Sequence, residues 1–177
     1  MWYKNIKAQN GLTLILFGIG IFCSLYFVHL TPELTQQEKH LIQAEVFSEL
    51  FLYLDAHPDV DADYFFVGVS GSDPAPEVVR SFNGQAPKVA PISSSMMSFG
   101  FSAAIVHKSN LNKSGIITDI KTMQRKENGR VNVITRIYYD RASFANYEFI
   151  LAKKDGAFRV VEVKYPDEKP NAEEVRP

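Results

Sequence analysis

Residues 130–141 read "RVNVITRIYYDR", and this stretch predicts the central strand of a sheet. Every second side chain is apolar or β-branched, which is the period of a β-strand that buries one face. The face expected to be buried holds Val131, Val133, Thr135, Ile137 and Tyr139. A strand of this kind needs neighbours on both sides and a covering layer, and the flanking sequence supplies candidates for both.

The neighbouring segments predict an antiparallel meander. Residues 115–126, "GIITDIKTMQRK", read as a strand, and "ENG" at 127–129 forms a tight turn into the central strand. Residues 143–154 and 158–166 read as a second hairpin around Asp155-Gly156. Residues 101–107 read as a further short strand. The C-terminal half therefore predicts four antiparallel strands in chain order.

A long amphipathic helix precedes these strands. Thr31-Pro32 is a favourable helix start, and His57-Pro58 a favourable stop. Between them lies a stripe of apolar residues at helical spacing: Phe47, Leu50, Phe51 and Leu54. Gln43, Glu45 and Glu49 are expected on other faces of this helix.

Between the helix and the meander, residues 61–70 predict a strand with Phe65, Val67 and Val69 on one face. A turn and a short helix over 71–82 follow, and then an irregular connection over 83–95. This order predicts the α+β class, with the long helix packed on a curved antiparallel sheet.

The N-terminal residues predict a membrane anchor. Residues 11–30, "GLTLILFGIGIFCSLYFVHL", contain no Asp, Glu, Lys or Arg. Twenty residues of helix match a bilayer core of about 30 Å. The alternative is a cleaved signal peptide, but this run exceeds the usual apolar region of roughly 7–15 residues, and no small-x-small cleavage site follows. Lys4 and Lys7 precede the span, so the bulk of the chain is expected outside the cytoplasm.

The segments divide the chain into four regions. Residues 1–10 are expected in the cytoplasm, 11–30 in the membrane and 31–165 in an extracytoplasmic α+β domain, followed by a polar tail over 166–177. The one cysteine, Cys23, lies inside the apolar run, so the domain is expected to hold together without a disulfide.

Three segments carry a resemblance to known proteins: "YFFVGVSGSDPAPEVVRSF" from residue 64, "APKVAP" from residue 86, and "YEFILAKKDGAFRVVEV" from residue 147. Over residues 35–165 the chain resembles uncharacterised bacterial membrane-anchored proteins whose extracytoplasmic domain is a cystatin-like or nuclear-transport-factor-like cone. The resemblance implies this fold in a bacterial protein; together with the predicted anchor, it makes the bacterial cytoplasmic membrane the expected location. It implies no activity. Scaffold subunits of type IV secretion systems share the order of anchor, long helix and sheet.

Two stretches resemble catalytic or metal motifs without completing them. "GVSGS" at 68–72 places Ser72 where a nucleophile elbow needs a second glycine, so Ser70 is expected in a structural turn. Asp59, Asp61 and Asp63 resemble the start of a calcium loop, but Tyr64 and Ser70 stand where such a loop needs glycine and glutamate. A solvated acidic loop is the simpler interpretation. We expect no catalytic, cofactor or metal residues, and no enzymatic activity.

Charge divides unevenly along the chain. Residues 31–77 hold ten acidic side chains and one basic, a balance of −9, whereas residues 78–164 hold fourteen basic and six acidic, a balance of +8. Internal complementarity between the halves is one interpretation. The other is an anion-binding face made of Arg125, Lys126, Arg130, Arg136 and Arg159. Nucleic acid is not an expected partner outside the cytoplasm.

The exposed face of the central strand is the candidate partner site. Its residues Ile134, Arg136 and Tyr138 combine an arginine with apolar and aromatic side chains, as protein interfaces do. We expect this face to contact a protein partner or a second copy, and we expect Tyr138→Ser to weaken that contact without unfolding the domain.

Three functional hypotheses remain open from the sequence. The first is a noncatalytic binding or scaffolding domain held at the membrane. The second is a scaffold subunit of a type IV secretion or conjugation machine. The third is a small-molecule binder or enzyme that uses the interior of the cone, with Asp119, Tyr147 or Glu148 as the buried titratable group.

Overall fold

The structure, a computed structural model, describes residues 32–57, 60–98, 104–140 and 143–165. The chain divides into two compact units, Met1–Glu33 and Leu34–Pro177, and the second contains the helices and strands described below. The expected regions 1–10, 11–30 and 166–177 lie outside the described residues. Within the described residues, no helix has the length and apolar character needed to cross a membrane.

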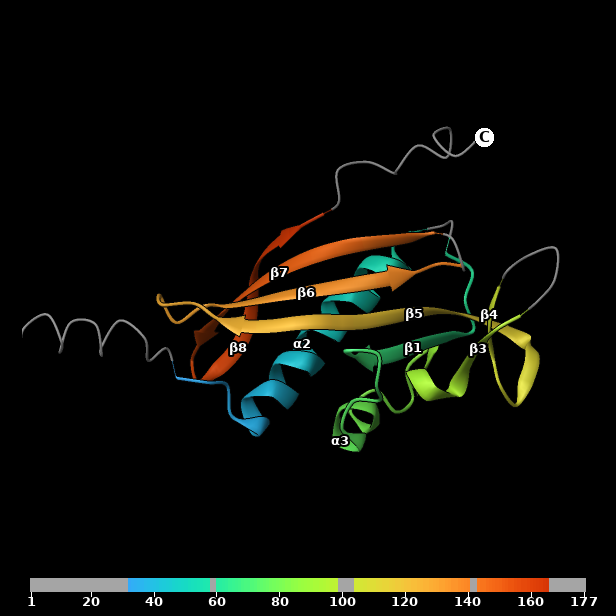
Figure 1. Cartoon of the computed structure of the whole chain (residues 1–177), viewed down its shortest axis with the longest axis horizontal. Coiled ribbons are helices and arrows are strands. Elements are labelled where there is room, and N and C mark those ends of the chain that lie inside the picture. The colour runs from blue at the N-terminus through green and yellow to red at the C-terminus, as the bar shows by residue number, and fades with distance from the viewer. Residues whose placement is uncertain (1–31, 58–59, 99–103, 141–142, 166–177) are drawn as a thin grey trace, which may run out of the picture. The chain divides into compact units, whose positions relative to one another are not determined.

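The second unit is α+β, with a curled mixed sheet and one long helix (Figure 1). The elements in chain order are α2 (Gln36–Asp55), β1 (Tyr64–Val69), α3 (Pro76–Arg80), β2 (Lys88–Pro91), the 3-10 turn η1 (Ile92–Ser94), β3 (Ser95–Met97), β4 (Ile105–His107), β5 (Asn110–Arg125), β6 (Val131–Tyr138), β7 (Phe144–Lys154) and β8 (Ala157–Lys164). The main sheet has the strand order β2-β1-β5-β6-β7-β8, with β3 and β4 joined through β5.

The predicted meander is confirmed, because β5, β6, β7 and β8 pair in chain order and antiparallel. The expectation of a wholly antiparallel sheet is wrong, since β1 runs parallel to both β2 and β5. The expected irregular connection over 83–95 is also wrong in part: β2 and the start of β3 lie within it. β2 has four residues and ends in Pro91, which suits the edge of a sheet but gives little strand signal.

Helix α2 begins later than predicted. Thr35, not Thr31, caps it: the Thr35 hydroxyl accepts from the backbone N–H of Glu38 at 3.2 Å, and the Glu38 carboxylate accepts from the N–H of Thr35 at 3.1 Å. This reciprocal capping box satisfies two donors at the helix start, which the Thr31-Pro32 pair does not offer. The end of the helix at Asp55 agrees with the predicted stop.

A pH dependence follows from this cap. The backbone hydrogen bond from Thr35, with the ion pair to Arg125, lowers the pKa of Glu38 below its ordinary 4.5. A lowered pKa stabilises the fold above the unfolded value, and this contribution is lost as pH falls through the folded value. In Glu38→Gln the amide oxygen still accepts from Thr35, so we expect a flatter decline of stability below pH 4.5 than in the native chain.

Urea unfolding followed by circular dichroism between neutral pH and about pH 3 measures this difference. Glu77→Gln is the matched control, because Glu77 lies on α3 and its ion pair is with the exposed Arg80. Parallel curves for the native chain and Glu38→Gln would contradict the assignment.

The main core lies between α2 and one face of the sheet, here named the inner face; in Figure 1 the helix runs behind the strands. The predicted helical stripe is confirmed as buried. Gln43, expected on another face, is buried with only 6% of its surface exposed. The predicted inward residues of β6 are buried as well, at positions 131, 133, 135 and 137.

A smaller cluster covers part of the opposite face, here named the outer face. Phe66, Ala90, Ile105 and Ile117 form it, with Ile92 and Tyr138 packed against them. β1 is therefore buried on both faces, as strands with two parallel neighbours commonly are. On the outer face over β6 and β7, the large apolar side chains Ile134 and Phe144 stay exposed.

Candidate binding face of the sheet

The strand register gathers polar and aromatic side chains into two rows on the outer face. One row runs Asp119, Arg136, Asn146 across β5, β6 and β7. The adjacent row runs Ile117, Tyr138, Phe144. The predicted partner residues Ile134, Arg136 and Tyr138 thus share the outer face, and Ile134 is 39% exposed.

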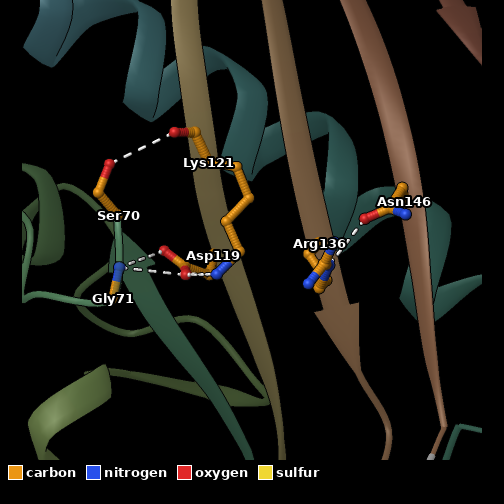
Figure 2. A network of polar contacts seen from close by, with 6 residues as sticks. All are labelled: Ser70, Gly71, Asp119, Lys121, Arg136 and Asn146. Atoms are coloured by element: carbon orange, nitrogen blue, oxygen red, sulfur yellow. Dashed lines mark hydrogen bonds and ion pairs between the residues drawn. The ribbon is translucent and has the colours of Figure 1, made fainter.

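Arg136 is held in place by two contacts from β7. Its Nε donates to Asn146 Oδ1 at 2.8 Å, and its guanidinium carbon lies 4.6 Å from the centre of the Phe144 ring. The first contact is drawn in Figure 2, where the two side chains project from neighbouring strands. A guanidinium stacked on an aromatic ring keeps its orientation while it stays charged.

Asp119 forms the buried centre of a second network, also shown in Figure 2. The Gly71 N–H donates to both carboxylate oxygens at 3.1 Å, and the Lys121 ammonium donates to Oδ2. Asp119 is only 1% exposed, so these donors compensate a charge that lies almost completely out of water. Gly68 leaves room for it: a Cβ there would lie 3.0 Å from Asp119 Oδ1 and 2.9 Å from Ile92.

Lys121 is therefore a fixed cation. Burial opposes its charge, but hydrogen bonds to Asp119 and Tyr138 outweigh burial and raise the pKa of Lys121. Its ammonium also lies 5.4 Å from the centre of the Tyr138 ring. A lysine with a raised pKa stays protonated at neutral pH and is a poor general base.

The serine turn is tied to β5. The backbone N–H of Ser70 donates to the Ile120 carbonyl at 2.8 Å, and its hydroxyl donates to the Lys121 carbonyl at 3.4 Å. Ser70 and Gly71 both have positive φ, 53° and 78°. The next helix, α3, begins only at Pro76. This geometry supports the structural turn predicted for Ser70, even though β1 is a parallel strand.

The acidic loop before β1 is partly paired. Asp63 accepts from the Lys113 ammonium at 2.6 Å and from the Ser114 N–H at 3.1 Å, and these donors lower its pKa. Asp59 lies outside the described residues. In the described parts of the chain, no three His, Cys, Asp or Glu side chains are placed to share a metal ion.

Acidic residues over 31–77 and basic residues over 78–164 form ion pairs with each other inside the domain. Among the described residues, four ion pairs join residues 31–77 to residues 78–164: Glu77 with Arg80 at 3.4 Å, Asp63 with Lys113 at 2.6 Å, Glu38 with Arg125 at 2.8 Å, and Glu45 with Arg159 at 2.9 Å. Arg125 and Arg159 thus pair with acidic residues of helix α2. These pairs favour the interpretation of internal complementarity over the five-residue anion-binding face.

The three titratable candidates for the cone interior separate. Tyr147 points into the main core, whereas Asp119 and Glu148 lie on the outer face, where Glu148 accepts from Asn132 and Lys164. The Tyr147 hydroxyl is 3.2 Å from that of Tyr139. Burial and the hydrogen bond with Tyr139 raise the pKa of Tyr147, so its phenol stays neutral.

Tyr138 is less suitable for mutation than expected. It is only partly exposed and packs against the smaller cluster, so Tyr138→Ser would also remove packing. Phe144, which sequence reasoning missed, is 46% exposed and is the better probe of the outer face. The alternation of "FANYEF" at 144–149 carried a signal for it, since positions 144, 146 and 148 share one face.

Comparisons of this chain with protein families, with curated proteins and with solved structures found no match.

Proposed function

We propose that this chain is a single-pass protein of the bacterial cytoplasmic membrane whose domain over residues 31–165 lies outside the cytoplasm and binds a protein partner without catalysis. The anchor rests on the uncharged stretch 11–30 and the lysines before it. The curled sheet on a long helix is consistent with a cone of the cystatin-like or nuclear-transport-factor-like kind.

The observation that carries the binding role is the outer face over β6 and β7. Ile134 and Phe144 are exposed there beside Arg136, whose guanidinium is already oriented. Aromatic residues and arginine dominate the binding energy of protein interfaces, and an oriented side chain loses less conformational entropy on binding.

The experiment that tests this role is crosslinking from outside the cell. A membrane-impermeant amine crosslinker is added to spheroplasts that carry the tagged full chain, and the captured proteins are identified by mass spectrometry. We expect one or more partners, and we expect Phe144→Ser to reduce their capture roughly tenfold, because truncating a central aromatic contact costs more than about 1 kcal/mol.

Leu111→Ser is the matched control, since Leu111 is 60% exposed at the start of β5. Equal capture by the native chain and Phe144→Ser would contradict the role of the outer face. Capture only after permeabilisation would contradict the proposed location. If the captured proteins are subunits of a secretion or conjugation machine, the result would favour the hypothesis that this chain is a scaffold subunit of such a machine.

A further inference from the structure

Arg136 has hydrogen-bond donors that do not take part in its contacts with β7. Nε is the atom that bonds Asn146, and the guanidinium carbon stacks on Phe144. The two terminal nitrogens form the remaining end of the planar fork, which is the end that binds a carboxylate through two parallel hydrogen bonds. The cation is therefore oriented by β7 before any ligand arrives.

The carboxylates nearest to Arg136 in the strand register already accept hydrogen bonds from other residues. Asp119 lies directly opposite on β5, but it accepts from Gly71 and Lys121. Glu148, on the next row of β7, accepts from Asn132 and Lys164. Among the described residues, the ion pairs of the chain leave Arg136 without a carboxylate of its own.

Three apolar or aromatic side chains lie near the fork, beside the polar groups Asn146 and Asp119. Ile134 precedes Arg136 on the same face of β6, Tyr138 follows it, and Phe144 lies beneath the guanidinium. An uncompensated cation on such a surface is complementary to an anion carried next to an apolar group. A simple inorganic anion would leave Ile134 and Phe144 uncovered, whereas a peptide with acidic and aromatic residues would cover them and pair the charge.

We propose that Arg136 determines partner specificity by binding a carboxylate within an acidic, aromatic-containing peptide segment of the partner protein. The terminal nitrogens of Arg136 donate to that carboxylate, while the adjacent apolar side chain packs on Phe144 and Ile134. This proposal rests on the proposed function, because it names the chemical class of the partner for the same face.

The test uses the full chain and a defined probe. A fluorescein-labelled, end-capped peptide of sequence Glu-Glu-Phe-Glu-Glu is titrated with the chain and followed by fluorescence anisotropy, with the Gln-Gln-Phe-Gln-Gln peptide as the uncharged control. We expect the glutamate peptide to bind and the glutamine peptide to bind at least tenfold more weakly. Added salt should weaken the binding of the glutamate peptide.

Variants at Arg136 separate geometry from charge. Arg136→Lys keeps the charge but loses the fork, so we expect about tenfold weaker binding, and Arg136→Gln should bind no better than Arg136→Lys. Arg130→Gln, at an exposed arginine before β6, is the matched control and should bind like the native chain. Circular dichroism of each variant checks that the fold is retained.

Equal binding by the native chain and both Arg136 variants would overturn the proposal. So would Arg136-dependent binding of vesicles of phosphatidylglycerol and phosphatidylcholine without binding of the glutamate peptide, since the anion would then be a lipid headgroup. If the peptide fails while Phe144→Ser still reduces crosslinked partners, the proposal about Arg136 falls and the binding role of the face stands.

Discussion

Replacing Phe51 by alanine is expected to lower the free energy of unfolding by about 4 kcal/mol, the largest effect of any single change considered for this domain. Phe51 is 1% exposed and stands at the centre of the main core. Its ring stacks on Phe65 at 4.8 Å and on Phe47 at 6.1 Å, and meets Phe82 edge-on at 5.1 Å. Truncation removes one ring from each of these three pairs and leaves a cavity in the core.

Urea unfolding, followed by far-ultraviolet circular dichroism, measures the difference in the free energy of unfolding between each variant and the native chain. The difference is calculated from the transition midpoints, with one common slope for all chains. Leu52→Ala is the matched control: it lies one residue away on the same helix and is 65% exposed, so we expect a change within about 0.5 kcal/mol. If the two variants were equally stable, α2 would not form the covering layer of the sheet.

Asp119→Ala is expected to be the second largest change, at about 2–3 kcal/mol. The substitution leaves the Gly71 N–H without its carboxylate and the Lys121 ammonium without its counter-charge. The Lys121 side chain is 31% exposed and can reach water, which keeps the loss below that of a wholly buried ion pair. We also expect the Ser70 turn to loosen, since Asp119 is one of its attachments to β5.

Two further variants separate the parts of this loss. Asp119→Asn keeps an oxygen that can accept from Gly71, so it isolates the charge and should cost less than Asp119→Ala. Adding Lys121→Met to Asp119→Ala removes the unpaired cation, and the double variant should be more stable than the sum of the two single losses predicts. Strict additivity of the two substitutions, measured by urea unfolding, would show that this ion pair does not couple.

The outer face explains why the site was only partly predictable. The period of two along β6 places Ile134, Arg136 and Tyr138 together, and their positions follow from sequence alone. Their cross-strand partners do not. Arg136 meets Asn146 and Phe144 because the β6–β7 hairpin closes in one register, and a shift by one residue would put those side chains on the inner face.

The Asp119 network depends on contacts between residues that lie still farther apart in the sequence. β5 has an irregular register between Ile120 and Thr122, and Lys121 occupies that position beside Asp119. The Gly71 donor comes from the turn after β1, 48 residues earlier in the chain. Nothing in the local pattern of "TDIKT" indicates that a distant glycine turn will bond this aspartate.

Local patterns were sufficient to predict the amphipathic stripe of α2, the alternation of β6 and the turns of the two hairpins, because each depends on residues within a few positions of one another. The packing of the whole domain sets three other features: β1 lies parallel between β2 and β5, Tyr147 is buried in the main core while Asp119 lies on the outer face, and the terminal nitrogens of Arg136 have no carboxylate partner among the described residues. Each of these depends on which strand edges meet and in what register, which is set by the fit of the whole core and not by any one segment.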